Sequence, residues 1–440
     1  MSEASVPERA TQASEARSPR DWEWVEPTVW TERMLAALEN GVKGGKWYSL
    51  WDKLIAPSTL EASWQRVARN RGAAGVDRVS VERFAANAPR SLQELHEELQ
   101  AGCYVPNPLK RVMIPKSGGK QRPLGIPAVK DRIVQGAVKL VIEPIFEREF
   151  LPASYGFRPG RSAKDALREV DAAIKDGLTF VVDADLASYF DTIPHTPLME
   201  RVGERISDGR VLALIRQFLD QEVIAGLDRW TPTQGSPQGA VLSPLLANLY
   251  LHGLDRAMHA QGYRMVRYAD DFVILCATEA QAQEALERVR HWVDHAGLRL
   301  HPEKTHSGDC RVPGQGFEFL GYRFEAGRRR VRKKSLAALT DRIRQKTGRS
   351  RGDSVQCIIA DLNPMLRGWY AYFKHAHGRV FRLVDGFVRR RLRAILRRHA
   401  GCTGRVGKSL TDHMRWPNAF FAAQGLFSLQ QAHEAACQSR

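Results

Sequence analysis

The chain has 440 residues, of which 43% are hydrophobic and 26% are charged, as in an ordinary globular protein of two or three domains. No apolar run approaches the ~20 residues of a membrane-spanning helix. The six cysteines form no Cys-x-x-Cys pair, which argues against a zinc site or a disulfide framework and favours a reducing cytoplasm. The net charge of +17 is uneven, because residues 1–322 sum to −2 and residues 323–440 sum to +19. Such a basic segment is typical of nucleic-acid binding, with an anionic membrane surface or simple solubility as the alternatives.

The N-terminal region divides into two parts. Residues 1–20 are rich in Ser, Ala, Glu, Arg and Pro, which predicts disorder. Residues 21–104 are rich in tryptophan and are predicted to be helical, with one clear helix over 91–100. Tryptophans in this setting are more typical of a hydrophobic core than of base stacking.

A basic hairpin is predicted next, with its turn at the Ser-Gly-Gly of residues 117–119. Lys116 and Arg122 flank this turn. The charges could protect an exposed sheet edge, or they could clamp a polyphosphate, and the residues alone leave both interpretations open. Helices are then predicted over 131–150 and from about residue 163.

Two acidic elements follow in the middle of the chain. A short apolar strand ends in Asp183 and Asp185, which share one face because alternate strand residues do. The stretch 264–275 is predicted to be a hairpin with Asp270 and Asp271 in its turn. Adjacent buried acids are unfavourable unless a cation neutralises them, and Mg²⁺ prefers such oxygen ligands. If the two strands are neighbours, the acids could form a two-metal phosphoryl-transfer site; the alternative is a solvated turn.

The remaining elements complete a mixed pattern. A Gly-Ser-Pro-Gln-Gly loop at 235–239 permits close approach to a ligand and precedes a helix that starts at Ser243. A helix over 278–296 and a strand pair over 317–324 follow, and 328–334 is predicted to be a basic linker into a helical region.

One helix of the C-terminal region combines an apolar stripe with many arginines. The stripe recurs at helical spacing and predicts packing on a core. The arginines outnumber the local acids, so we expect them to form a phosphate-binding surface rather than a solvated face. They are Arg389, Arg390, Arg391, Arg393, Arg397 and Arg398.

In their order along the chain, these motifs resemble the reverse transcriptase domain of bacterial group II intron-encoded proteins, the reverse transcriptase–maturases. The matching segments span about residues 105–325, and residues 335–430 resemble the family's thumb and maturase region. The segments are IPKSGGKQRPLGIP, KDRIVQ, ASYGFRPGRSA, VVDADLASYFD, QGSPQGAVLSPLLANLYL, VRYADDFVIL, LHPEKT and FEFLGYRF.

The resemblance implies an α+β fold with right-hand polymerase architecture. Fingers and palm with an antiparallel sheet are expected, followed by an all-α thumb and maturase domain. The implied divisions are a disordered N-terminus at 1–20, a helical extension of the fingers at 21–104, fingers and palm at 105–327, and a basic helical thumb/maturase domain at 328–440.

The resemblance also implies catalytic residues. Asp185, Asp270 and Asp271 are similar to the family's catalytic, metal-binding acids, with two Mg²⁺ ions as cofactor and Mn²⁺ as the alternative ion. Asp183 lies outside the family's ligand positions, so it is left out of the expected site.

Five further residues match the family's nucleotide-binding positions. Phe190 resembles the ring that crowds a ribose 2′-hydroxyl and so favours deoxynucleotides. Lys116 and Arg122 match the finger hairpin that grips the triphosphate. Gln238 matches the glutamine over the nucleotide, and Lys304 the basic residue that assists pyrophosphate departure.

The implied function is that of an RNA-directed DNA polymerase of a group II intron, which also binds the intron RNA to assist splicing and retrohoming. The implied partners are the intron RNA as template, a DNA primer or target and dNTPs, with no membrane; the oligomeric state stays open. A splicing-only maturase, or a domesticated or defence-associated reverse transcriptase of the same fold, are the alternatives. Many relatives append a zinc-bearing endonuclease with paired cysteines, which this sequence lacks. Bottom-strand cleavage is therefore not expected, and priming from a nascent strand at a replication fork is the implied route.

Overall fold

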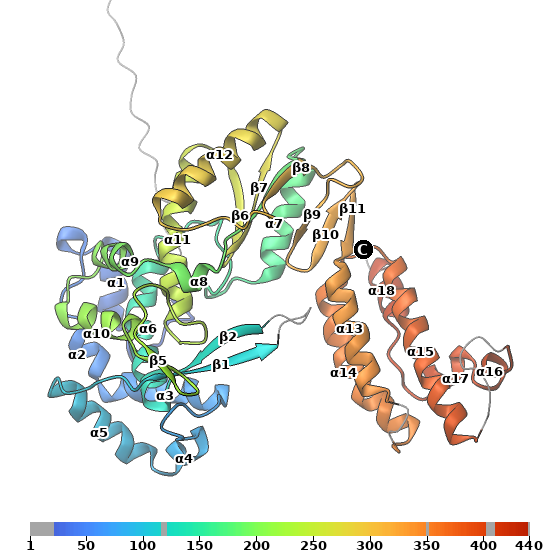
Figure 1. Cartoon of the computed structure of the whole chain (residues 1–440), viewed down its shortest axis with the longest axis horizontal. Helices are drawn as coiled ribbons and strands as arrows, with labels where there is room; N and C mark the ends of the chain where they lie inside the picture. Colours follow the sequence, from blue (N-terminus) through green and yellow to red (C-terminus); the bar gives the residue numbers. More distant parts are fainter. Residues whose placement is uncertain (1–21, 116–120, 349–351, 402–409, 439–440) are drawn as a thin grey trace, which may run out of the picture.

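The computed structural model describes residues 22–115, 121–348, 352–401 and 410–438, and it confirms the α+β right-hand architecture (Figure 1). In Figure 1 the fingers lie on the left, the palm sheet at the top and the thumb helices on the right. None of the described helices is long and apolar enough to cross a membrane.

The fingers combine helices with a small mixed sheet. Strand β1 (Leu109–Pro115) pairs antiparallel with β2 (Gln121–Ile126) and parallel with β4 (Val223–Ala225), which pairs with β5 (Asp228–Trp230). The predicted basic hairpin is therefore confirmed. The helices of the fingers are α1 (Glu32–Asn40), the 3-10 helix η2 (Lys43–Gly45), α2 (Trp51–Ile55), α3 (Pro57–Asn70), α4 (Val81–Ala86), α5 (Ala88–Gln100) and α6 (Val129–Glu147).

The palm is built on an antiparallel sheet with the strand order β6-β7-β3-β8. Its strands are β3 (Phe180–Asp185), β6 (Arg264–Tyr268), β7 (Asp271–Cys276) and β8 (His306–Asp309). The predicted hairpin over 264–275 is thus β6–β7, and it lies beside the first acidic strand. The helices of this region are α7 (Ala163–Lys175), α8 (Tyr189–Thr192), α9 (His195–Gly203), α10 (Gly209–Leu219), α11 (Ser243–Ala260) and α12 (Glu279–His295).

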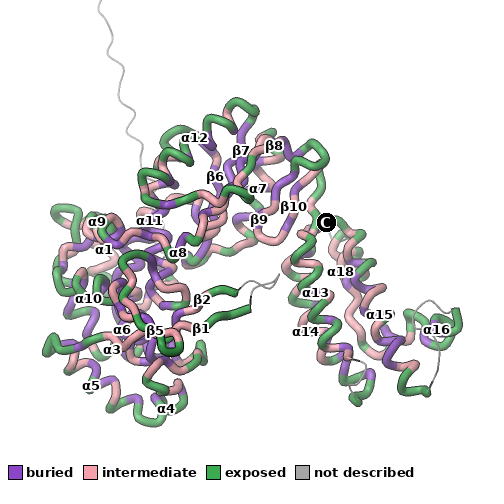
Figure 2. The backbone as a smooth tube through the Cα atoms, viewed as in Figure 1, coloured by how far each residue is buried: buried purple, intermediate pink, exposed green. Residues whose placement is uncertain are grey.

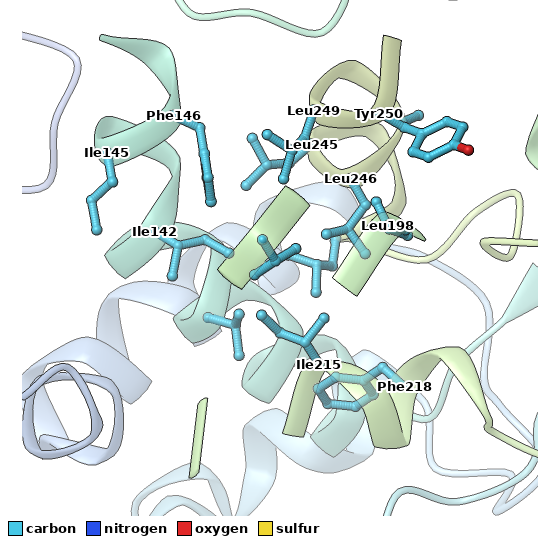
Figure 3. Packing of buried hydrophobic residues seen from close by; sticks show 14 of the residues in the cluster. Ile142, Ile145, Phe146, Leu198, Ile215, Phe218, Leu245, Leu246, Leu249 and Tyr250 are labelled. Carbon is cyan, nitrogen blue, oxygen red and sulfur yellow. The ribbon is translucent and has the colours of Figure 1, made fainter. Parts of the chain in front are cut away.

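The first hydrophobic core joins the fingers to one face of the palm sheet. It contains Val182 and Ile274 from that face together with side chains from the fingers. Figure 3 shows part of it, where α6 contributes Phe146, α11 contributes Leu245 and α10 contributes Ile215. Because these helices and the sheet share one core, the fingers form a firm support for the strands that carry the acids.

The second hydrophobic core lies on the other face of the palm sheet and extends into the thumb. Val181 and Val273 from the sheet belong to the same buried cluster as Ile358 and Leu392 from the thumb. Figure 2 shows the resulting buried segments along the thumb helices. These helices are α13 (Lys333–Lys346), α14 (Val355–Phe373), α15 (Arg379–His399), α16 (Leu410–Arg415), α17 (Asn418–Ala423) and α18 (Leu429–Gln438).

The prediction of a basic linker over 328–334 is wrong. Residues Arg328–Val331 form strand β11, which pairs with β10 (Tyr322–Glu325), and β10 pairs with β9 (Phe317–Phe319). Helix α13 begins at Lys333, so a single residue, Arg332, separates it from β11. The charge of this segment hid its strand character, because alternate arginines of an edge strand can point to solvent while the backbone pairs on one side.

Candidate active site

The register of β3 against β7 brings the predicted acids together. Asp185 is the direct cross-strand partner of Asp271, so the two side chains lie on the same face of the palm sheet. Asp270 occupies the turn between β6 and β7, next to Ala269, which adopts a left-handed conformation with φ of 60°. The geometry therefore confirms the expectation that the two acidic strands are neighbours.

Electrostatic repulsion is concentrated on Asp271. Burial, followed by the charges of Asp183, Asp185 and Asp270, raises the pKa of Asp271 from 3.8 to about 7. The site thus holds more negative charge than its surroundings neutralise. A carboxylate in this condition is a strong ligand for a cation, which would relieve the repulsion.

Asp183, which shares the strand face of Asp185 but lies outside the family's ligand positions, contributes to the electric field of the site. Burial is the main cause that raises its pKa to about 6. Its Oδ2 accepts a hydrogen bond of 3.4 Å from the backbone N–H of Glu318 and lies 3.9 Å from Nε2 of His306. These contacts hold the Asp183 carboxylate beside β9. From there its negative charge helps to raise the pKa of Asp271.

Lys304 forms an ion pair with Asp185, and its Nζ donates to Oδ2. The turn that carries Lys304 is fixed to the end of β3, since the N–H of His301 donates to the carbonyl of Asp185 over 2.7 Å. The structure therefore places Lys304, the residue predicted to assist pyrophosphate departure, in contact with Asp185, one of the predicted catalytic acids.

The fit of these residues to a divalent cation rests on their chemistry. Across residues 22–438, apart from the undescribed gaps, no three His, Cys, Asp or Glu side chains are arranged as a ligand set for one ion. The oxygen donors are nevertheless those that Mg²⁺ and Mn²⁺ take, and their mutual repulsion is what such an ion would neutralise.

A buried polar network holds the turn of the β6–β7 hairpin. Arg267 is fully buried and forms a two-pronged ion pair with the buried Asp255 of α11. Its Nη1 donates to Oδ1 of Asn248 and to the carbonyl of Ala269, each over 2.9 Å. Asn248 in turn donates to the carbonyl of Gly156 over 2.7 Å. The guanidinium thus ties helix α11 to the residue that precedes Asp270.

Gly156 lets a second segment approach this turn. A Cβ at Gly156 would lie 2.3 Å from the backbone nitrogen of Ala269, so only glycine fits. Sequence reasoning missed this network. Its signal was a charged residue, Arg267, within the apolar strand β6, together with Asn248 and Asp255 on the apolar side of a helix.

A cavity of about 250 Å³ lies between the basic hairpin and the palm. It is lined by Phe190 and Gln238, both of them predicted nucleotide-binding residues. Arg122 Nε donates to Oε1 of Gln238 over 2.5 Å. Lys116, the other predicted triphosphate contact, lies outside the described residues.

Asp191 is a cavity residue that the sequence did not single out. Its burial raises the pKa of the carboxyl, while the nearby Arg111 and Arg122 lower it. Oδ2 of Asp191 accepts a 3.4 Å hydrogen bond from Gln238. The signal that could have found Asp191 is its place directly after Phe190.

The glycines of the 235–239 loop, which lines this cavity, also pack closely against the protein's own backbone. A Cβ at Gly239 would lie 2.5 Å from the carbonyl oxygen of Gly125 in β2, and one at Gly235 would lie 2.9 Å from that of Asp191. The loop therefore packs on the protein's own backbone, and this close packing joins the hairpin to the palm.

Two of the predicted RNA-binding arginines are used inside the thumb. Arg393 is buried, and its guanidinium donates to the carbonyl of Trp416 and to Oδ1 of Asn418, each over 2.9 Å. Arg397 forms a 2.8 Å ion pair with the buried Asp412. The prediction that these side chains present a phosphate-binding surface is therefore wrong for Arg393, whose buried contacts attach Trp416 and α17 to α15.

The other four arginines of the group differ in exposure. Arg390 and Arg398 are exposed, whereas Arg389 and Arg391 are half-buried. Arg391 Nε donates to Oγ1 of Thr347 over 2.9 Å. Arg390 and Arg398 are thus the two members of this group that remain well placed for RNA.

The raised pKa of Asp271 makes a prediction about stability. The native state holds the Asp271 proton up to about pH 7, whereas the unfolded chain loses it near 3.8, so stability falls as the pH rises through this window. Asp271→Asn removes that loss. In the presence of a chelator, we expect the variant to gain about 1–2 kcal/mol over the parent protein between about pH 5 and about pH 8, measured by urea unfolding. The pKa shift of Asp271 alone corresponds to about 4 kcal/mol of unfolding free energy. Partial solvent access to the carboxylate lowers the gain that we expect. A pH-independent difference between the two proteins would contradict the prediction.

Comparisons with known proteins identify the family. Residues 114–324 match the family model for reverse transcriptase (RNA-dependent DNA polymerase), and residues 336–408 match the model for the group II intron maturase-specific domain.

Protein YkfC of Escherichia coli (strain K12) is 38% identical over 291 residues, which cover 57% of this chain and 75% of YkfC. The group II intron-encoded protein LtrA of Lactococcus lactis subsp. cremoris is 34% identical over 210 residues, covering 47% of this chain and 34% of LtrA. An uncharacterized 91 kDa protein in a cob intron of Schizosaccharomyces pombe is 40% identical over 164 residues, covering 37% of this chain and 20% of that protein. The chain therefore belongs to the family of group II intron-encoded reverse transcriptases and maturases.

Proposed function

We propose that the protein is an RNA-directed DNA polymerase of a group II intron, which copies intron RNA from a DNA primer with dNTPs. The observation that carries the proposal is the β3–β7 register, which sets Asp185 opposite Asp271 and beside the turn that holds Asp270. Phosphoryl transfer by such a site depends on positioning and charge neutralisation, and it needs no covalent intermediate.

In this proposal Asp185, Asp270 and Asp271 would hold two divalent cations. When bound, these cations would neutralise the negative charge on the attacking and leaving oxygens. The primer 3′-hydroxyl attacks the α-phosphate of the dNTP, the bond to the β-phosphate breaks, and pyrophosphate leaves. Arg122 and Lys116 bind the triphosphate, and Lys304 balances charge on the departing pyrophosphate.

Phe190 is proposed to select the sugar. Its ring lines the cavity between hairpin and palm, where it would crowd a ribose 2′-hydroxyl. Phe190→Ala is expected to raise the use of ribonucleotides relative to deoxynucleotides by at least about tenfold. Steady-state kcat/KM for paired rNTPs and dNTPs measures this ratio. Tyr189→Phe is the matched control, because the hydroxyl of this neighbouring residue donates to the carbonyl of Ala247, and its loss should leave the ratio unchanged.

Extension of a DNA primer on an RNA template tests the polymerase proposal directly. Purified protein should extend the primer with dNTPs when Mg²⁺ or Mn²⁺ is added, and a chelator should stop the reaction. A protein that binds the primer–template but never extends it with either ion would overturn the proposal.

A second function, assistance of RNA splicing, is favoured by the maturase-specific match and by the net charge of +19 over residues 323–440. The basic thumb would bind structured intron RNA and stabilise its active form. Splicing of the intron RNA that surrounds the coding sequence should then be faster with Asp270→Asn protein than without protein. Equal rates would restrict the function to DNA synthesis.

We assign the cytoplasm as the compartment, in keeping with the free state of the cysteines in the described segments.

A further inference from the structure

A basic cavity lies where the palm helix α7 meets β11 and the end of helix α14. Its volume is about 270 Å³, and its floor includes Tyr322 and Tyr372. The hydroxyl of Tyr322 donates to the carbonyl of Tyr372 over 2.7 Å, so the floor is fixed. None of the residues proposed above for catalysis or nucleotide binding lines this cavity. Its charged lining residues are Lys164, Arg168, Asp171, Lys175, Arg329 and Lys374.

The cavity has more positive charge than its own acid can balance. Asp171 is its one carboxylate among the described lining residues, and it lies 3.0 Å from Lys175 and 3.3 Å from Arg329. In the described part of the chain, no carboxylate lies within ion-pair distance of Lys164 or Lys374. Arg168 pairs with Asp165, a carboxylate outside the lining. Five lining cations therefore face two carboxylates, and a bound polyanion would balance the excess.

The arrangement of the cations favours an extended ligand. On α7 they follow a single stripe from Lys164 through Arg168 to Lys175, which spans about 16 Å along the helix. Arg329 and Lys374 approach this stripe from two other elements of the fold. A row of charges this long is better matched by successive phosphates of a nucleic-acid strand than by one free phosphate or a mononucleotide.

We propose that this cavity binds the phosphodiester backbone of structured RNA, at a second contact outside the polymerase site. The proposal rests on the RNA-binding half of the proposed function. Lys164 lies in the segment that matches the reverse transcriptase model, and Lys374 in the segment that matches the maturase-specific model. RNA bound here would therefore contact both domains and hold the thumb against the palm.

Neutralising the two unpaired lysines tests the proposal. Both are exposed, so Lys164→Gln and Lys374→Gln should leave the fold intact. The double variant is expected to bind a labelled RNA hairpin about tenfold more weakly, and the slope of log Kd against log salt should fall by about 2. Lys53→Gln, an exposed lysine on α2, is the matched control and should change neither quantity. Primer extension on a short template should stay within about twofold of the parent protein.

The possible results separate this proposal from its competitors. RNA affinity that falls no further in the double variant than in Lys53→Gln would overturn it. If the double variant lost as much affinity for a DNA duplex of the same sequence, the surface would bind polyanions in general rather than RNA in particular. Binding to vesicles of anionic lipid that depends on the two lysines while RNA binding does not would assign the surface to a membrane. Failure of the proposed function would show instead as absent extension and absent splicing assistance, with the lysine-dependent RNA affinity unchanged.

Discussion

Asp270→Asn is expected to lower the rate of primer extension by about 100-fold to 1000-fold, while the protein stays folded. The substitution keeps the size of the side chain but removes a charge from the turn that faces Asp185 and Asp271. Asp185→Asn should have an effect of similar size, because Asp185 is the direct cross-strand partner of Asp271. Single-turnover extension with saturating primer–template and dNTP measures the chemical step separately from binding.

The control for this prediction is an acid of the same type outside the site. Asp294→Asn removes an exposed carboxylate from α12 and should leave extension within about twofold of the parent rate. If Asp270→Asn protein extended primers at the parental rate, the catalytic assignment of the hairpin would be wrong. A large loss in both variants would point to the overall charge of the protein rather than to the site.

Arg267→Ala should cost about 3–5 kcal/mol of unfolding free energy, and it should also abolish extension. The substitution leaves the buried carboxylate of Asp255 without its cation. It also removes the donor that holds the carbonyl of Ala269 beside Asp270. Urea unfolding measures the first effect and extension kinetics the second.

A double variant separates stability from positioning in this network. Arg267→Met with Asp255→Leu replaces the buried ion pair by apolar side chains of similar size, a change that is often neutral or stabilising. We expect this protein to regain most of the lost stability but little of the lost activity. Recovery of full activity together with stability would show that the network supports the fold alone and does not position the turn.

Local pattern was sufficient to predict the elements that carry the acids. Short apolar runs predicted the strand that ends in Asp185 and the hairpin around Asp270, and the motif order predicted the family. The helix expected over 91–100 begins at Ala88, and that expected over 131–150 runs from 129 to 147. Such shifts at helix ends are normal, because end residues lack the full set of backbone hydrogen bonds.

Long-range pairing was the part that local pattern could not predict. The cross-strand pairing of Asp185 and Asp271 depends on a register between strands that are 86 residues apart in sequence. The role of Arg393 could not be foreseen, because its partners come later in the chain, from Trp416 after α16 and from Asn418 at the start of α17. The charge of residues 328–334 predicts a solvent-exposed linker, whereas pairing with β10 makes Arg328–Val331 a strand.

The hydrophobic core that the palm shares with the thumb has a consequence for how the protein is made. Val181 and Val273 share this cluster with Val170 of α7, which precedes them in the chain, and with Ile358 and Leu392 of the thumb, which emerge from the ribosome long after them. The nascent palm can therefore pack α7 against its sheet, but the core stays incomplete until most of the chain has been translated. Apolar surface left exposed in this way favours aggregation, so folding in the cell should depend on protection of that surface during synthesis.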